Sequence, residues 1–319
     1  MSAHRHSRRD FISLAGTAVL GLGPLATRLS AMHAAAIPER KFYTVLSVGR
    51  IGFKASFPES VSLAAKYGFE GVDPNAEYFA KLSNDELKRQ LDDLKSKNLK
   101  LGAAGLPVEF RKDEDTFNEG LKKLPAVADV LQKAAVTRIS TYILPFSDDL
   151  TYLQNFRQHA ARLRPCAQIL KDRSLRLGLE YVGPRTSWRS KRHPFVHTLS
   201  EIKELIVAIG TGNVGVQLDT YHWFNAEESQ EDILTLRPED VITVDVNDAP
   251  AGLTLDQQMD LSRELPGATG IIPVKEFIDG LKKIGYDGPI HAEPFNAALR
   301  AKPLDEACAL TAAAVKRVI

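Results

Sequence analysis

Gly215-Val216-Gln217-Leu218-Asp219-Thr220-Tyr221-His222 is a short apolar stretch that runs into an acidic residue and, three residues later, a histidine. Such groups at a strand end indicate a catalytic or metal site on an α/β scaffold, because the strand fixes the backbone while the loop leaves room for a ligand. An apolar strand followed by a carboxylate recurs three times: Leu177-Gly178-Leu179-Glu180, Ile242-Thr243-Val244-Asp245 and Ile290-His291-Ala292-Glu293. The prediction of a catalytic or metal site depends on this repetition, because a single such stretch is a weak signal.

Strand-like and helix-like segments alternate along the rest of the chain. Capping boxes at Ser83/Glu86 and Thr198/Glu201 begin two of the predicted helices. Eight strands are predicted, at residues 42–48, 71–73, 99–104, 137–144, 175–181, 215–219, 242–245 and 290–293. Because buried parallel strands read as short continuous apolar runs, eight such units predict a closed (β/α)8 TIM barrel. An open doubly wound sheet is the alternative, but no glycine-rich dinucleotide motif follows the first strand.

The first 36 residues have the features of a twin-arginine (Tat) signal peptide. Arg8 and Arg9 precede an uncharged run that ends near a small-residue segment. An uncleaved membrane anchor is the alternative, although the run is short for a bilayer span and contains Pro24. We therefore expect a periplasmic or secreted protein, a single barrel domain over residues 37–319, and no stable membrane insertion after signal cleavage.

The charge balance argues against a nucleic-acid partner. The chain is 44% hydrophobic and 25% charged, which is typical of soluble globular proteins. Of its 41 basic and 40 acidic residues, four arginines and one aspartate lie in residues 1–36, which leaves 37 basic and 39 acidic residues. A slightly negative protein does not favour polyanions, so we expect no nucleic-acid partner. The sequence leaves open whether the chain forms a homo-oligomer.

Four acidic residues are predicted to lie side by side. In a parallel barrel all strands end on the same face, so the carboxylates after strands five to eight form one side of a ring. These residues are Glu180, Asp219, Asp245 and Glu293. Carboxylates this close repel one another, and a divalent cation is the simplest way to keep them all ionised. The alternative is four unrelated acids that cap helices.

These residues resemble the sugar-phosphate isomerase/epimerase family of xylose isomerase-like TIM barrels. The family has a Glu ending strand five, Asp-x-x-His after strand six, His-x-x-Asp after strand seven and a Glu after strand eight. Glu180, Asp219 with His222, and Glu293 match this pattern. One position departs from it, because Asp245 stands where the family usually has a metal-binding histidine.

This departure leaves two candidate metal sites. If Asp245 joins Glu180, Asp219 and Glu293, all ligands are oxygens, which suits Mn²⁺ or Mg²⁺ better than Zn²⁺. If instead His222 supplies a nitrogen ligand, Asp245 does not bind the metal itself and contacts the residues that do. Manganese is the expected ion, with magnesium, cobalt, iron or zinc as alternatives. Four carboxylates exceed the charge of one divalent ion, so a basic neighbour is also expected.

The resemblance implies a metal-dependent sugar isomerase or epimerase that transfers a proton beside a carbonyl through an enediolate. Glu180 and Glu293 are the implied catalytic acid/base pair. The implied substrate-binding residues are His222, Arg263, Asn247 and Asp248. Because phosphorylated sugars are mainly cytoplasmic, export favours a free sugar or sugar derivative. Two alternatives remain: a 3-keto-glycoside lyase or hydrolase using the same proton abstraction, and a sugar- or metal-binding protein without turnover.

Overall fold

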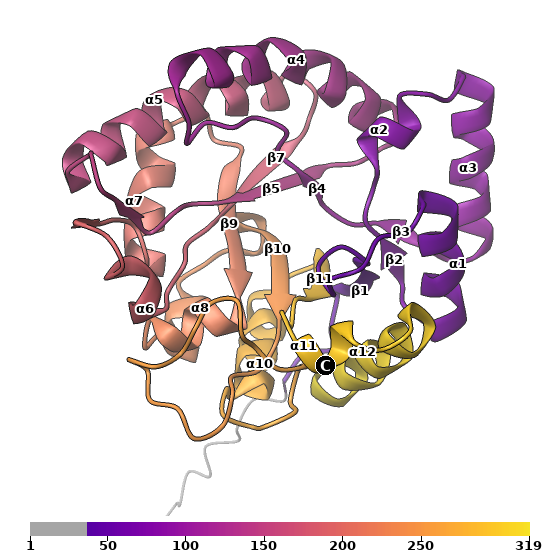
Figure 1. Cartoon of the computed structure of the whole chain (residues 1–319). Helices are drawn as coiled ribbons and strands as arrows, with labels where there is room; N and C mark the ends of the chain where they lie inside the picture. The colour runs from indigo at the N-terminus through magenta and orange to yellow at the C-terminus, as the bar shows by residue number, and fades with distance from the viewer. Residues whose placement is uncertain (1–36) are drawn as a thin grey trace, which may run out of the picture. The chain divides into compact units, whose positions relative to one another are not determined.

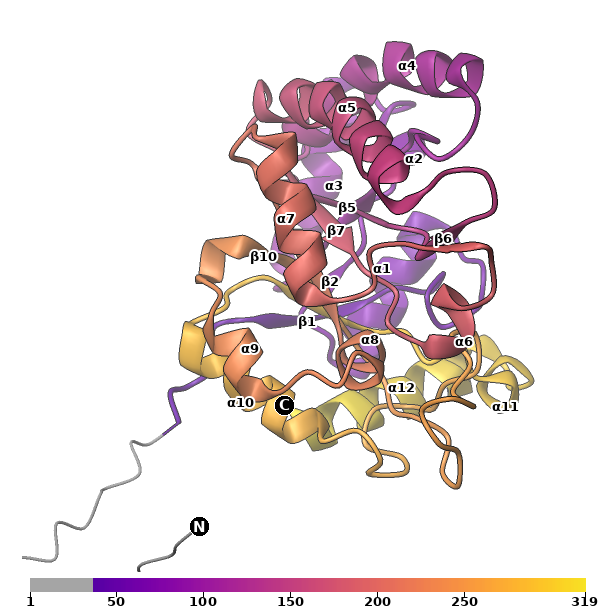
Figure 2. The same cartoon turned by 90° about the vertical axis from the view of Figure 1, so that its left-hand side faces the viewer.

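The computed structural model describes residues 37–319, and the predicted Tat signal in residues 1–36 lies outside the described residues. In the described part, helices surround a ring of strands (Figures 1 and 2). Among residues 37–319, none of the helices combines the length and the apolar character that a membrane span requires.

The elements follow the predicted alternation of strand and helix. The strands of the ring are β1 (Tyr43–Leu46), β2 (Gly71–Val72), β3 (Lys100–Leu101), β4 (Ala104–Gly105), β5 (Arg138–Tyr142), β7 (Arg176–Glu180), β9 (Val214–Asp219), β10 (Val241–Val246) and β11 (Pro289–Ala292). The longer helices are α1 (Phe57–Tyr67), α3 (Asn84–Ser96), α4 (Glu114–Lys133), α5 (Tyr152–Lys171), α7 (Leu199–Ile209), α10 (Val274–Ile284) and α12 (Leu304–Val318). The short elements are α2 (Ala76–Phe79), α6 (Arg185–Trp188), α8 (Thr220–Asn225), α9 (Gln230–Leu234), α11 (Ala297–Arg300), the 3-10 turn η1 (Pro238–Asp240) and the antiparallel pair β6 (Phe146–Ser147) and β8 (His193–Pro194).

The ring closes through residues 100–105. The strand order is β3-β2-β1-β11-β10-β9-β7-β5-β4, and its two end strands are consecutive pieces of one segment. β3 pairs in parallel with β2, and β4 pairs in parallel with β5. Between them, an added Cβ at Gly102 would lie 2.5 Å from Asp73 Oδ1, so only glycine fits there without a shift. Counting β3 and β4 as one strand gives eight, which confirms the predicted (β/α)8 barrel.

The helices form where the sequence indicates, with one difference that matters for the site. Ser83 and Glu86 make the predicted capping box of α3. The sequence predicts one short helix near residues 227–234, but the structure has two, because α8 begins directly after β9. Asp219 is the N-cap of α8, and its side chain accepts hydrogen bonds from the backbone of Tyr221 and His222. The first turn of α8 therefore holds His222 close to Asp219.

Candidate active site

The structure brings the four predicted carboxylates together at one end of the barrel. Glu180, Asp219 and Asp245 come from β7, β9 and β10, and Glu293 follows β11 directly. One oxygen from each of the four lies within 4.8 Å of the others. Asp219 and Asp245 are fully buried, and the Glu293 side chain is 14% exposed. We call these four residues the carboxylate cluster.

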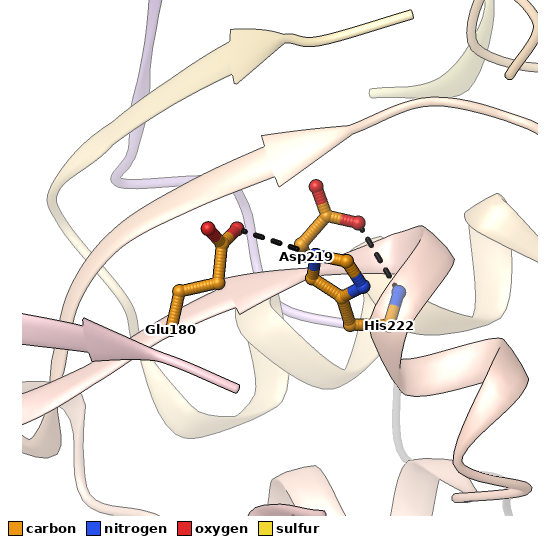
Figure 3. Close-up of side chains that lie close together, drawn as sticks. All are labelled: Glu180, Asp219 and His222. Carbon is orange, nitrogen blue, oxygen red and sulfur yellow. Dashed lines mark hydrogen bonds and ion pairs between the residues drawn. The ribbon is translucent and has the colours of Figure 1, made fainter. Parts of the chain in front are cut away.

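His222 lies beside Glu180 and Asp219 of the cluster, as Figure 3 shows. Its Nε2 atom is 3.9 Å from Glu180 Oε1, and its backbone N–H donates to Asp219 Oδ1 at 3.2 Å. Burial lowers the pKa of His222, so the imidazole is neutral near pH 7. A neutral imidazole facing the cluster is suited to hydrogen bonding with a substrate oxygen.

Gln217 links two members of the cluster. It precedes Asp219 by two residues on β9, so both side chains lie on the same face of the strand. Its Nε2 donates to Glu180 Oε1 at 3.0 Å and to Asp245 Oδ2 at 2.6 Å. Asp245 Oδ2 also accepts from Arg50 at 2.6 Å, whereas its other oxygen, Oδ1, is buried and has no hydrogen-bond partner. The unpartnered Oδ1 has the character of a cation ligand.

Arg263, which is buried, and Arg50, which is partly buried, supply the expected basic neighbours. Arg50, in the loop after β1, donates to Asp245 and, at 3.3 Å, to Glu293 Oε1. Arg263, in the long loop after β10, donates to Asp219 Oδ2 at 2.9 Å and to Glu293 Oε2 at 3.2 Å. The sequence prediction included Arg263 but missed Arg50, which is 195 positions from Asp245. Its only sequence signal is its place shortly after the first strand.

The charges of the site fit a divalent cation. Four carboxylates against two guanidinium groups leave at least two negative charges without compensation. Burial, followed by repulsion from Glu293, Asp219 and Asp245, raises the pKa of Glu180 well above its usual range. Burial and Asp245 likewise raise the pKa of Glu293 to about 8. A cation with two charges would balance the excess and keep these carboxyl groups ionised.

In the structure the side chains of Asn247 and Asp248, both predicted to bind substrate, make contacts within the protein. Asn247 Nδ2 donates to both carboxylate oxygens of Asp219, at 3.2 and 3.1 Å, and so orients that side chain. Asp248 is fully buried and accepts four backbone hydrogen bonds, from Ala249, Thr269, Gly270 and Ile272. Because its oxygens are already satisfied, Asp248 anchors the loop that carries Arg263. Sequence position placed both residues correctly at the strand end but did not indicate where their side chains point.

Two further acids beside the cluster were missed by the sequence prediction. Asp260 Oδ1 accepts from Arg263 Nη2 at 2.6 Å and lies 3.8 Å from His222 Nε2. Asp73, just after β2, lies 2.8 Å from Nε2 of the buried His291, whose Nδ1 is 3.7 Å from Asp245 Oδ1. These contacts orient the groups around the cluster from two sides.

Comparisons with known proteins agree with this architecture. A family model described as xylose isomerase-like TIM barrel matches residues 61–314. An inosose isomerase from Halalkalibacterium halodurans is 25% identical over 232 residues, which cover 70% of this chain and 76% of that protein. The solved structure of a xylose isomerase domain protein from Alicyclobacillus acidocaldarius has a TM-score of 0.76 at 29% identity, covering 87% of this chain and 98% of that one.

A more distant structure, of the IolI protein with a bound zinc atom, has a TM-score of 0.71 at 18% identity and covers 87% of this chain and 98% of that one. At this identity the likeness shows the fold alone. The family model, in contrast, covers most of the chain, including the strands that carry the cluster. The chain therefore belongs to the xylose isomerase-like TIM barrel family.

Proposed function

We propose that this protein is a divalent-metal-dependent isomerase or epimerase that moves a proton beside the carbonyl of a free sugar or sugar derivative. The observation that carries the proposal is the carboxylate cluster, whose four oxygens lie within 4.8 Å of one another in a buried site. The relationship to an inosose isomerase, at 25% identity, supports the same class of reaction. Ketones that resemble an inosose are therefore the first substrates to test.

Glu180, Asp219, Asp245 and Glu293 are the residues that would hold the cation. The unpartnered Oδ1 atom favours Asp245 over His222 as the fourth ligand. The guanidinium group of Arg263 also lies 3.3 Å from His222 Nε2, and its positive charge opposes a cation at that nitrogen. An all-oxygen set suits Mn²⁺ or Mg²⁺, and we propose Mn²⁺.

A divalent cation bound here supplies Lewis acidity that polarises a carbonyl group. Glu180 and Glu293 come from β7 and the end of β11, with β9 and β10 between them in the sheet. They therefore approach a substrate from two sides, so one removes the proton and the other returns it to the opposite face or to the next carbon. His222 and Arg263 bind substrate oxygens and limit the entry of water.

Proton NMR in deuterated buffer tests this proposal. Protein covering residues 37–319 is treated with EDTA, reloaded with Mn²⁺ and incubated with an inosose and a panel of free ketoses. We expect deuterium at the carbon beside the carbonyl, together with an isomer or epimer, and neither product with the EDTA-treated protein. If Mn²⁺ stays bound but no substrate exchanges, a binding protein without turnover becomes the better explanation.

The same first step serves an elimination. If the substrate is a 3-keto-glycoside, removal of the neighbouring proton allows the group at C1 to leave, which is the lyase alternative. A 3-keto-glucoside in the same NMR experiment separates the two reactions. Release of the aglycone indicates the lyase, and deuterium uptake with the glycosidic bond intact indicates the isomerase or epimerase.

A further inference from the structure

An apolar pocket of about 490 Å³ adjoins the candidate active site at Asp260. It lies between the loop after β5, the segment from β7 to α6, and the long loop between β10 and α10. Figure 2 shows α6 and β6 on the near side of the barrel. A hydrogen bond of 2.6 Å from Thr186 Oγ1 to the carbonyl oxygen of Gln258 ties α6 to the long loop. The apolar wall consists mainly of Tyr142, Leu144, Phe146, Val182, Met259 and Leu261.

The pocket and the candidate active site share Asp260. Asp260 lines the pocket and at the same time contacts Arg263 and His222 in the candidate active site. Val182 follows Glu180 by two residues, and Tyr142 is the ladder partner of Glu180 where β5 pairs with β7. A molecule held at the cluster can therefore extend into the pocket.

The wall of the pocket exposes large apolar side chains. Tyr142, Met259 and Leu261 are 46%, 55% and 71% exposed. Grouped exposed hydrophobic residues beside a polar site are typical of a ligand-binding surface. The Tyr142 ring is held by Arg111, whose guanidinium carbon lies 4.1 Å from the ring centroid and whose side chain is only 9% exposed. This contact gives the pocket an aromatic wall of fixed orientation.

From this arrangement we propose that the pocket binds an apolar, aromatic-sized substituent on the substrate of the carboxylate cluster. The inference rests on the proposed function, since it places the polar part of the same molecule at the cluster. A volume of about 490 Å³ is in the range of small-molecule sites, and the polar boundary at Asp260 fits a ligand that is polar at one end and apolar at the other. The substrate class is thus a sugar derivative that carries an aryl group, such as an aryl glycoside or its keto form.

Isothermal titration calorimetry with two probes tests the inference. The probes are 4-nitrophenyl β-D-glucopyranoside and methyl β-D-glucopyranoside, each measured in EDTA and again with Mn²⁺. We expect the nitrophenyl compound to bind at least about tenfold more tightly, because only its ring buries apolar surface in the pocket. An equal affinity for both probes, or no binding of the nitrophenyl probe, would overturn the inference.

Variants of the exposed wall residues test whether the preference for the nitrophenyl probe arises in this pocket. Met259→Asp and Leu261→Asp are expected to reduce the preference for the nitrophenyl probe to less than about twofold, because a charge in the wall opposes an apolar ring. Leu253→Asp is the matched control, since Leu253 is also an exposed leucine in the long loop, at 42%, but does not line the pocket. The preference must survive in this control, and its loss there would count against the pocket.

Calorimetry and deuterium exchange together separate a failure of the pocket inference from a failure of the proposed function. If the wild-type protein prefers the nitrophenyl probe but exchanges no proton of any ketone, the proposed function is wrong and the pocket stands. If it exchanges the protons of an inosose but shows no preference for the aryl group, the proposed function stands and the pocket inference is wrong.

Discussion

The two halves of the barrel differ in strand length and in the charges at the strand ends. In the acidic half, from β7 to β11, the strands β7, β9 and β10 have five, six and six residues. In the first half, from β1 to β5, the strands β2, β3 and β4 have two residues each. All four cluster carboxylates belong to the acidic half, whereas the first half contributes Arg50 and Asp73.

This difference in strand length is related to the groups that each half contributes to the site. A ladder of four to six residues fixes both the position and the direction of the side chain at its end, which a buried cluster of carboxylates requires. An arginine in a loop after a strand tolerates less exact placement, because its long side chain adjusts to the acids it contacts. The acidic half therefore supplies the four carboxylates and one compensating arginine, Arg263, and the first half supplies the other, Arg50.

The largest expected effect comes from removing an acid of the acidic half. We expect Glu180→Gln to reduce deuterium exchange by about 1,000-fold, because the amide neither accepts nor returns the proton. Glu70→Gln is the matched control in the first half, where Glu70 precedes β2 and pairs with Arg40 at the surface. The control should change the rate less than about twofold. More than a tenth of the wild-type exchange in Glu180→Gln would exclude this residue from proton transfer.

Arg50→Ala tests charge compensation by the first half. Removing this guanidinium leaves Asp245 and Glu293 without one of their partners, and we expect the EDTA-treated protein to lose about 3 kcal/mol of unfolding free energy. Added Mn²⁺ should recover part of the loss. Arg40→Ala, which removes a partly exposed ion pair, should cost less than about 1 kcal/mol. Urea denaturation measures both, and equal losses would contradict the assignment of Arg50.

Helix α5, which lies between the two halves in the sequence, buries a titratable group that is neutral. His159, on α5, packs against Phe110 and Phe195, and its Nε2 atom has no hydrogen-bond partner. Burial, helped by the charges of Arg111 and Arg162, lowers the pKa of His159 from 6.5 to about 4. A lowered folded-state pKa gives a contribution to stability that is present above pH 6.5 and is lost as the pH falls toward 4.

His159→Leu should remove that dependence. At pH 5 the unfolded imidazole is protonated while the folded one is mostly neutral, so wild-type protein should lose about 2 kcal/mol relative to pH 8, beyond any loss in the variant. Urea unfolding of both proteins in EDTA at pH 8 and pH 5 measures the difference. Because the carboxylate cluster titrates equally in both proteins, parallel pH profiles would rule out the imidazole as the cause.

The smallest expected effect comes from changing Asp245, which stands where the family usually has a metal-binding histidine. Asp245→Asn keeps an oxygen in place but removes its charge, and we expect Mn²⁺ to bind about tenfold more weakly. Asp240→Asn is the control, because Asp240 precedes the other end of β10 and pairs with Arg237 at the surface. Titration of EDTA-treated protein with Mn²⁺ gives both affinities. Unchanged affinity in Asp245→Asn would return the fourth ligand position to His222.

The sequence predicted most of the fold and the centre of the site. Apolar runs and capping boxes are local signals, and they identified the eight strands and the longer helices. The acids at strand ends could also be found, because residues 177–293 have strands regular enough to be read from their apolar pattern. Residues 99–104 were predicted as one strand, and only the structure shows the interruption at Gly102 through which the ring closes.

The surroundings of the cluster were predicted less well. Arg50 and Asp73 are far from the acidic half in sequence and follow no motif. Gln217 lies within the stretch that revealed the site, but its role depends on the neighbouring strands that bring Glu180 and Asp245 to its amide. Asp248 had the expected position, but the sequence did not show that the backbone of the long loop folds around its carboxylate.

The sequence by itself determined the barrel and the four carboxylates of the cluster, because strand periodicity and the parallel rule place strand ends on one face. Arg263 was predicted from the resemblance to the family. The Tat signal stays a prediction, since it lies outside the described residues. Only the tertiary structure decided that Arg50 balances the acids, that Asp245 keeps one oxygen without a partner and that an apolar pocket adjoins the candidate active site. These features depend on the directions of side chains from segments distant in sequence, which folding alone brings together.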